Sequence, residues 1–341
     1  MQSLLRGPTR VFGQHIRMLT TIPKLDPVRV RRSLLYVPGS SEKMVIKSKH
    51  LHPDTLVFDL EDSVAGHRKS AARRIVFQAL QDAPERSPEL CVRINPPSED
   101  QSLAASDLDV IMQSGRLQAI LIPKVESAED VVFVVNKISE SKPAYVPPLA
   151  VIVSVESAHS LCNLPEIIAA SQKHIETHLS DGIVKIAAVL FASEDYCATT
   201  GVKRTLSRKG LWYPRAAMVT TAKGMGLEAI DMVCIDYKKQ EYLLEECEEG
   251  AEFGFDGKQA IHPAQIATIN AVFSPTKQGM RKDALTVEIE QAKAIHLAYT
   301  EAVEHQNKGA TTLTHENREI MIDAPMVQQA RRTLLRAKIE V

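Results

Sequence analysis

Short apolar runs alternate with longer, amphipathic segments along the chain from about residue 30 onward. Eight runs have the length and the apolar content of buried strands; they span residues 33–39, 55–62, 90–95, 119–125, 149–156, 186–195, 228–236 and 253–262. Segments between them, such as 67–82 and 128–140, carry apolar residues near positions i, i+3, i+4 and i+7, which is typical of amphipathic helices. Eight strand–helix units over about 240 residues predict an α/β protein whose parallel sheet closes as a (β/α)8 TIM barrel. An open, doubly wound sheet is the alternative, but no G-x-G-x-x-G motif follows the first run.

The chain continues well beyond the barrel pattern. No boundary interrupts residues 31–275, which we assign to the barrel, and residues 276–341 are expected to form a C-terminal helical extension. The extension contains, in order, a long helical pattern (282–306), a break at Gly309, the short stretch EIMIDAP (319–325) and a last helix from about Met326. A closed barrel has no place for such a segment, so we expect it to pack outside the barrel, on a neighbouring subunit.

The run LAVIVSVE at 149–156 ends on a charged residue, Glu156. Side chains of a strand alternate between its two faces; one face would carry Ala150, Ile152, Ser154 and Glu156, and the other Val151, Val153 and Val155. One face is then fully apolar, while the other becomes polar at its end. The simplest interpretation of Glu156 is a loop residue just past a strand, unless other polar side chains gather beside it.

Charged and polar residues follow most of the predicted strands. The C-terminal strand ends of a TIM barrel meet at one rim, where active sites are built. The residues at these ends are Asp59, Glu61, Asp62, Arg93, Asn95, Lys124, Glu126, Glu156, Glu194, Asp195 and His262. Acids from three strands with Arg93 between them fit a hard-cation site, although each residue alone is compatible with an ordinary loop. Glu156 and Asp195, from adjacent strands, would give Mg²⁺ two oxygen ligands and leave other positions for water and substrate.

Zinc is not indicated by the sequence. His174 and His178 lie four residues apart on a predicted helix, but no Cys/His cluster accompanies them. We therefore interpret both histidines as surface residues.

Composition narrows the classes of function. The chain has 341 residues, 44% of them hydrophobic and 24% charged, as expected for a globular protein. A formal net charge of -1 and the lack of a long Lys/Arg run give no electrostatic case for binding nucleic acid. The five cysteines are odd in number and widely spaced, which favours reduced thiols in a non-secretory compartment. Beyond residue 30, no apolar run approaches the ~18 residues that a membrane span requires, so no membrane association is expected.

The first 25 residues have the pattern of a mitochondrial transit peptide. They contain Arg6, Arg10, Arg17 and Lys24, no acid, and apolar residues at roughly helical spacing. The arginines interrupt the apolar core that a secretory signal would need. A disordered cytosolic N-terminus is the alternative.

Eight motifs follow one another from Arg31 to the last predicted helix: RRSLLYVPG, FDLEDSV, VRIN, LIPKVES, VESA, SEDY, GFDGKQAIHPAQI and MIDAP. Together they resemble the citrate lyase β-subunit-like family. The resemblance implies a homotrimeric TIM barrel that binds Mg²⁺ and an acyl-CoA and cleaves a 3-hydroxyacyl-CoA into acetyl-CoA and a 2-oxo acid. For the mitochondrial member the substrate would be (3S)-citramalyl-CoA, the keto product pyruvate, and the location the matrix. Malate or β-methylmalate synthase activity, in which glyoxylate joins an acyl-CoA, and thioester hydrolysis are implied as side activities.

The resemblance also assigns roles to single residues. It implies Mg²⁺ ligation by Glu156 and Asp195, contact of Arg93 with the developing oxyanion, and a catalytic role for Asp323, delivered into the barrel mouth of the adjacent subunit. The implied contacts with coenzyme A come from Tyr36, Lys43, Lys47, Ile261 and His262. Glu61 and Asp62 would support the metal site from behind.

Several of these roles have a simpler structural alternative. Lys43 and Lys47 fit the solvated face of a helix, and His262 fits a rigid loop start before proline. Arg93 fits a salt bridge with Glu61 or Asp62, which is compatible with its catalytic role. By position alone, Asp323 fits a helix N-cap.

The sequence departs from the family pattern at Ala192-Ser193, where relatives often have two glycines. The added side chains are expected to narrow the pocket beside the metal and to bear on the choice of keto acid. Two other functions fit the same barrel. A class II pyruvate aldolase would not need the cations Lys43 and Lys47, and a non-catalytic CoA-binding trimer would have no physical reason to keep a costly acidic cluster.

Overall fold

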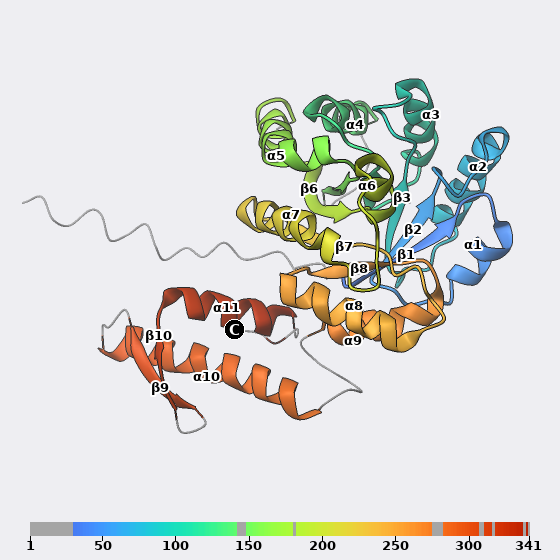
Figure 1. Cartoon of the computed structure of the whole chain (residues 1–341). Helices are drawn as coiled ribbons and strands as arrows, with labels where there is room; N and C mark the ends of the chain where they lie inside the picture. Colours follow the sequence, from blue (N-terminus) through green and yellow to red (C-terminus); the bar gives the residue numbers. More distant parts are fainter. Residues whose placement is uncertain are drawn as a thin grey trace, which may run out of the picture.

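The predicted TIM barrel is confirmed by a computed structural model, which describes residues 30–141, 148–179, 182–274, 282–306, 310–315, 318–336 and 339. Eight parallel strands close in chain order, β1 pairing with both β2 and β8, and helices surround them (Figure 1). The strands are β1 Ser33–Pro38, β2 Thr55–Asp59, β3 Glu89–Arg93, β4 Ala119–Ile122, β5 Leu149–Val155, β6 Val184–Phe191, β7 Glu228–Asp231 and β8 Gly257–Ala260. The helices, with short 3-10 turns (η), are α1 Glu42–Ser48, η1 Gly66–Arg68, α2 Lys69–Gln81, α3 Gln101–Ile111, α4 Ala128–Glu140, α5 Ala158–His178, α6 Ser193–Thr200, η2 Lys209–Leu211, α7 Trp212–Gly224, α8 Gln240–Phe253, η3 Pro263–Gln265 and α9 Ile266–Val272.

All eight strands are shorter than the apolar runs that predicted them, β7 and β8 by the most. The run at 186–195 ends as a strand at Phe191, because Glu194 and Asp195 already belong to the first turn of α6, where acids are favoured by the helix dipole. The run at 228–236 is a strand only as far as Asp231. The run at 253–262 starts late, because α8 continues to Phe253 and ends on Gly254 in the left-handed conformation.

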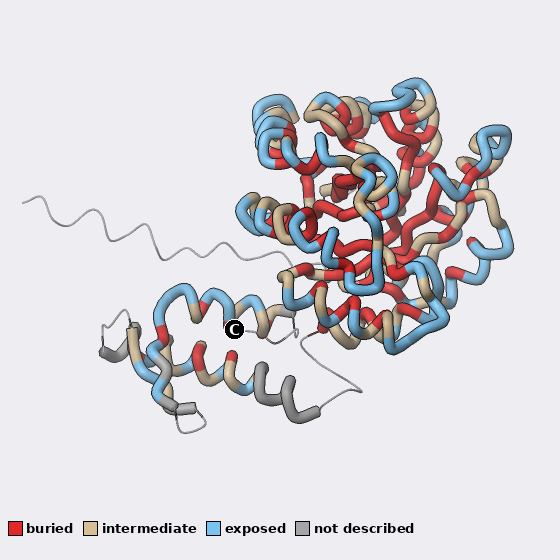
Figure 2. Tube along the Cα trace, viewed as in Figure 1, coloured by how far each residue is buried: buried red, intermediate tan, exposed pale blue. Residues whose placement is uncertain are grey.

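Buried residues gather in the barrel (Figure 2), where they form two clusters. A large cluster lies between the strands and the surrounding helices, and a smaller one fills the barrel interior. Strand β5 contributes to both as the period-two pattern predicted: Ala150 and Ile152 belong to the interior, while Val151 and Val153 pack against the helices. The interior face of β5 therefore leads directly to Glu156 at the rim.

The barrel closes at the β8–β1 seam on a glycine. A Cβ at Gly257 would meet the carbonyl oxygen of Arg31 at 1.9 Å and that of Arg32 at 2.6 Å. The next residue, Lys258, donates its backbone N–H to the Arg32 carbonyl at 2.8 Å. Only a residue without a side chain allows the two strands to approach this closely.

The extension lies outside the ring of barrel helices (Figure 1). It consists of α10 Lys282–Gln306, the antiparallel pair β9 Thr311–His315 and β10 Arg318–Ile322, and α11 Ala324–Arg336. Its helices were predicted, but the hairpin was not: β9 reads TTLTH, which is too polar to register as a buried strand. A third hydrophobic cluster belongs to the extension alone; it contains Ala292, Ile295, Ile322, Val327, Ala330 and Leu334.

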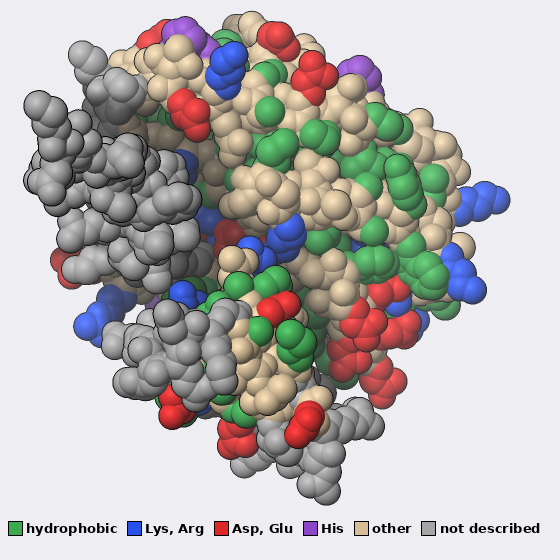
Figure 3. Space-filling view, turned by 90° about the vertical axis from the view of Figure 1, so that its left-hand side faces the viewer, with side chains coloured by type: hydrophobic (Ala, Val, Ile, Leu, Met, Phe, Trp, Pro, Cys, Tyr) green, Lys and Arg blue, Asp and Glu red, His purple; other side chains and the backbone are tan. Residues whose placement is uncertain are grey.

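The surface of the face shown in Figure 3 mixes charged side chains of both signs, with acidic side chains gathering along one edge. None of the helices in the described part of the chain is long and apolar enough to cross a bilayer. The predicted transit peptide, residues 1–25, lies outside the described residues.

Candidate functional site

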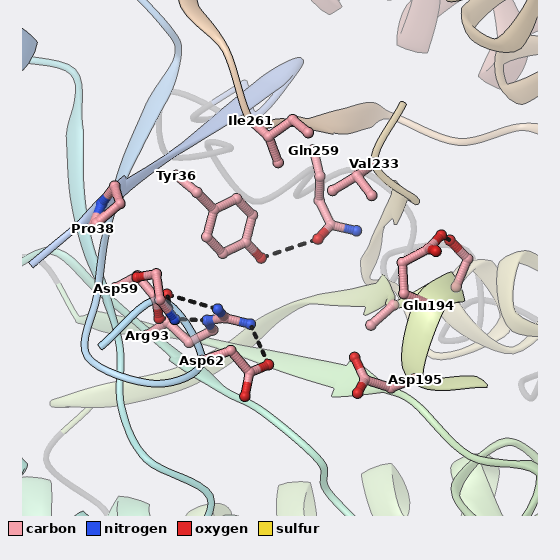
Figure 4. A pocket seen from close by; sticks show the side chains of 13 residues that line it. Tyr36, Pro38, Asp59, Asp62, Arg93, Glu194, Asp195, Val233, Gln259 and Ile261 are labelled. Atoms are coloured by element: carbon pink, nitrogen blue, oxygen red, sulfur yellow. Dashed lines mark hydrogen bonds and ion pairs between the residues drawn. The ribbon is translucent and has the colours of Figure 1, made fainter. Parts of the chain in front are cut away.

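A cavity of about 460 Å³ opens where the C-terminal ends of the strands meet. It is lined by Tyr36, Pro38, Asp59, Asp62, Ser63, Arg93, Ala192, Ser193, Glu194, Asp195, Val233, Gln259 and Ile261 (Figure 4). Most of these side chains follow or end a barrel strand, so the strand ends bring them together from distant parts of the sequence. The cavity is therefore at the rim where the sequence placed a site.

The guanidinium of Arg93 is held from one side by carboxylates. Its Nε and Nη2 donate to the two oxygens of Asp59 at 2.7 and 2.8 Å, and Nη1 lies 2.8 Å from Glu61 Oε2. Its plane lies over the ring of Tyr36, 5.0 Å from the ring centre. A guanidinium has five N–H groups, so these three contacts leave one on each terminal nitrogen without a hydrogen bond; Nη1 also lies 3.9 Å from Asp62 (Figure 4).

The two carboxylates beside Arg93 differ in their electrostatics. Burial acts to raise the pKa of Asp59, but the hydrogen bonds and charge of Arg93 outweigh it, and this pKa lies below its usual value. The pKa of Glu61 is raised to about 8 by burial, and neighbouring Glu156 and Asp62 add to the rise. Neither carboxylate oxygen of Glu61 has a hydrogen-bond partner among the described residues, although Arg93 and Lys124 lie within ion-pair distance.

Glu156 and Asp195 form a second acidic pair. Glu156 follows β5 and is 4% exposed, whereas Asp195 is half-buried in the first turn of α6 and lines the cavity. Burial raises the pKa of Glu156, and the charge of Asp195 adds to the rise. Two neighbouring carboxylates, one of them buried, are costly without a cation, and oxygen ligands suit a hard divalent ion. The pair thus fits a metal such as Mg²⁺, although only Asp195 of the two lines the cavity.

Lys124 links the two acidic pairs. Its φ of 44° is in the left-handed region, which a lysine rarely adopts. Its backbone hydrogen-bonds to the Glu156 carboxylate, while its Nζ lies 3.4 Å from Glu61 and 3.1 Å from Glu99. Strained backbone of this kind persists where the surroundings fix it, which is common in functional sites.

Gln259 fixes the direction of the Tyr36 hydroxyl. Its amide nitrogen donates to the carbonyls of Phe191 and Asp231 at 2.9 and 3.1 Å, at the ends of β6 and β7. The amide oxygen therefore faces Tyr36, whose hydroxyl donates to it at 3.1 Å. With its proton committed, the Tyr36 oxygen offers only an acceptor to the cavity.

Three of the predicted coenzyme A contacts lie away from the cavity lining. Lys43 and Lys47 are exposed on α1, one turn apart. His262 is exposed, stacks on Tyr237 at 4.7 Å and accepts the backbone N–H of Ala264, so it caps η3 as the loop-start alternative predicted. The neighbouring Ile261 does line the cavity.

Asp323 caps α11 within its own chain. Its Oδ1 accepts the backbone N–H of Met326 at 3.2 Å, and its side chain is exposed. The N-cap alternative is confirmed, and Asp323 does not line the cavity of the chain that carries it.

The two predicted surface histidines have ordinary contacts. His174 lies within hydrogen-bond distance of Asn136 at 2.8 Å and stacks on His178. In the part of the chain that the structure describes, no group of three or more His, Cys, Asp or Glu side chains is placed to hold a metal.

Some residues of the site escaped the sequence reasoning. Gln259 lies inside β8, and Arg204 reaches the cavity wall from the loop after α6, so neither stands at a strand end. Asp59 and Lys124 do lie at strand ends, where the sequence predicted them. Their contacts with Arg93 and Glu156 were not predicted.

Comparisons with known proteins identify the family of the chain. The family model HpcH/HpaI aldolase/citrate lyase matches residues 32–263. Human mitochondrial citramalyl-CoA lyase is 35% identical over 307 residues, which cover 89% of this chain and 84% of the relative. The citrate lyase subunit beta of Haemophilus influenzae is 32% identical over 314 residues, covering 91% and 98%.

Among solved structures, the chain is similar to the protein CitE from Mycobacterium tuberculosis in complex with magnesium, acetoacetate and coenzyme A. The TM-score is 0.63 at 26% identity, with 91% of this chain and 98% of that chain covered. The family match spans all eight strands of the barrel and the rim residues Arg93, Glu156 and Asp195. The chain therefore belongs to the HpcH/HpaI aldolase/citrate lyase family and is an enzyme of that family.

Proposed function

We propose that the chain is a Mg²⁺-dependent acyl-CoA lyase that cleaves (3S)-citramalyl-CoA into acetyl-CoA and pyruvate. The observation that carries the proposal is that Asp195, the neighbour of buried Glu156, lines the same cavity as Arg93. The 35% identity with human citramalyl-CoA lyase supports this substrate, and the magnesium and coenzyme A bound to the solved CitE relative support the cofactor.

Glu156 and Asp195 would hold the metal. Bound Mg²⁺ would supply Lewis-acid polarisation at the 2-oxo acid end of the substrate. The two carboxylates leave the remaining coordination positions for water and substrate, as a Mg²⁺ site requires.

Arg93 acts at the thioester end of the substrate. Cleavage breaks the carbon–carbon bond between the acetyl and the tertiary alcohol carbon; the hydroxyl loses a proton and the acetyl carbon gains one. The electron pair of the broken bond passes through the thioester enolate, whose oxygen carries negative charge. Arg93 lines the cavity, and Asp59 already fixes its guanidinium, so its remaining N–H groups would stabilise that charge without reorganisation.

Coenzyme A is proposed to bind between the cavity and α1. Exposed Lys43 and Lys47 offer cations to its phosphates. Tyr36 and Ile261 line the inner part of the route, and His262 lies at its outer edge.

Asp323 is proposed to complete the site of a neighbouring subunit. Asp323 is exposed and does not line the cavity of its own chain. The cavity in which it would act is therefore that of another subunit. There it would exchange the proton of the acetyl carbon. We therefore propose a homotrimer with an extension that packs on its neighbour, located in the mitochondrial matrix; the mitochondrial names of the relatives support the location.

Two side activities are proposed for the same site. A (3S)-malyl-CoA thioesterase from Cereibacter sphaeroides is 32% identical over 274 residues, which supports thioester hydrolysis when water meets the activated acyl group. Condensation of glyoxylate with an acyl-CoA follows from running the carbon–carbon step in reverse.

The direct test incubates the purified chain with Mg²⁺ and (3S)-citramalyl-CoA and measures acetyl-CoA and pyruvate. Equimolar appearance of both products is expected, with none after EDTA treatment. Cleavage of 4-hydroxy-2-oxo acids without any CoA requirement would instead identify a pyruvate aldolase. Tight CoA binding without turnover of either substrate would identify a non-catalytic CoA-binding trimer.

A further inference from the structure

Two adjacent carboxylates line the cavity at the start of α6, yet they point in different directions. Asp195 turns toward the middle of the site, whereas the Glu194 carboxylate turns away from it (Figure 4). Glu194 is 52% exposed, so nothing about its burial prevents it from swinging toward a cation. The sequence gives no reason why one acid of this pair would bind a metal and the other would not.

Arg204 holds Glu194 aside. Its Nη1 forms an ion pair with Glu194 and donates to the hydroxyl of Ser193 at 2.9 Å. That hydroxyl in turn donates to Glu194 at 3.1 Å. The Arg204 guanidinium and the Ser193 hydroxyl therefore hold the Glu194 carboxylate on the side away from Asp195.

Arg204 is itself firmly anchored. Its Nη2 donates to the carbonyl of Val233 at 2.6 Å and to Glu246 at 3.0 Å. Glu246 is completely buried and is also paired with Lys258 of β8 at 3.3 Å. The side chain of Arg204 is only 8% exposed, so its position is set by the barrel and not by the loop that carries it.

We propose that Arg204 determines the charge and selectivity of the metal site by withholding Glu194 from the cation. The inference rests on the proposed Mg²⁺ site at Glu156 and Asp195. A third carboxylate would add negative charge and occupy a coordination position that water or substrate needs. It would also favour Ca²⁺, which takes six to eight oxygen ligands, over Mg²⁺, which keeps several waters.

The test is a metal-binding cycle with Mn²⁺ as an EPR-visible probe, together with Mg²⁺ and Ca²⁺ titrations by calorimetry. In Arg204→Lys the side chain is shorter and has one ammonium group. It is expected to keep the ion pair with buried Glu246 and to lose the ion pair with Glu194. Mn²⁺ should then bind about tenfold more tightly, and the preference for Ca²⁺ over Mg²⁺ should rise. In the double variant Arg204→Lys with Glu194→Gln both changes should disappear.

Weaker or unchanged Mn²⁺ affinity in Arg204→Lys would overturn the proposal. The proposal would also be overturned if Arg204→Lys changed the Mn²⁺ affinity equally in the protein with Glu194 and in the protein with Glu194→Gln. A merely structural role of Arg204 predicts weaker binding that Glu194→Gln does not restore. If the Lys variant does not fold, Arg204→Gln with Glu246→Gln replaces the buried ion pair by a neutral one and makes the same prediction. The proposed metal site fails separately, if the unmodified protein binds no Mn²⁺ or if Glu156→Gln binds it unchanged.

Discussion

Arg93 and Asp59 face each other as a two-point ion pair, with Nε–Oδ1 at 2.7 Å and Nη2–Oδ2 at 2.8 Å. This contact joins the ends of β2 and β3 and fixes the plane of the guanidinium over Tyr36. Asp59 therefore sets the direction of the Arg93 N–H groups that remain for a ligand, and it can do so without touching the substrate.

Asp59→Asn should lower kcat about 100-fold, because the amide cannot accept from both guanidinium nitrogens and a small misplacement of a catalytic group costs about that much. Steady-state kinetics with citramalyl-CoA measure the effect. The matched control is Asp54→Asn: Asp54 binds Arg32 with the same two-point geometry, at 2.6 and 2.8 Å, before β1 and β2 at the opposite end of the barrel. Equal losses of kcat in the two variants would show that the changes affect the stability of the barrel and not the orientation of Arg93.

Glu156→Gln and Asp195→Asn should each nearly abolish turnover while the barrel remains folded. Each change removes one ligand charge and almost no volume. Activity assays with circular dichroism check the two parts of the expectation, and EDTA should mimic the variants in a way that added Mg²⁺ reverses. Full activity in metal-free buffer would contradict the metal site.

Lys43→Ala combined with Lys47→Ala should raise KM for the thioester much more than it lowers kcat, because contacts with distant phosphates stabilise ground and transition states alike. The difference should shrink as salt rises and screens those contacts. Lys137→Ala with Lys173→Ala removes the same charge from α4 and α5 and serves as the control. An unchanged KM at low salt would place coenzyme A elsewhere.

Asp323→Asn and Glu156→Gln should each be inactive alone, yet trimers refolded from a mixture should regain part of the activity. Some interfaces then join an intact metal site to an intact aspartate from the next chain. A mixture of Glu156→Gln with Asp195→Asn is the control, since both changes damage the same metal site and no interface can restore it. Mixed trimers that form but stay inactive would mean that Asp323 acts only as the cap of α11.

Glu61→Gln should remove part of the pH dependence of stability in metal-free protein. The pKa of Glu61 lies at about 8 in the folded chain against a usual 4.5, so the folded state binds the extra proton between these values. The free energy of unfolding therefore falls as pH rises through this window. Urea unfolding at pH 5 and pH 8 should show a smaller fall for the variant, and equal falls would contradict the raised pKa.

The barrel could be predicted because parallel strands buried on both faces are continuous apolar runs that end in polar loops. For the same reason Arg93, Glu156 and Asp195 could be grouped: they end or follow strands, and all such ends meet at one rim. Arg204 could not be assigned, because nothing local tells which acids a loop arginine will meet. Gln259 binds backbone carbonyls at the ends of two other strands. Every residue has such a carbonyl, so the sequence does not tell which ones Gln259 will meet.

The extension has a hydrophobic cluster of its own, and the barrel closes its interior without it. The chain therefore has separate hydrophobic cores in the barrel and in the extension. We expect a truncation after the barrel to yield a folded protein that keeps Glu156 and Asp195 but lacks Asp323, the cap of α11. In the proposed homotrimer, such a fragment made beside the full chain would take the place of a subunit and leave the neighbouring site without Asp323, its proposed proton donor.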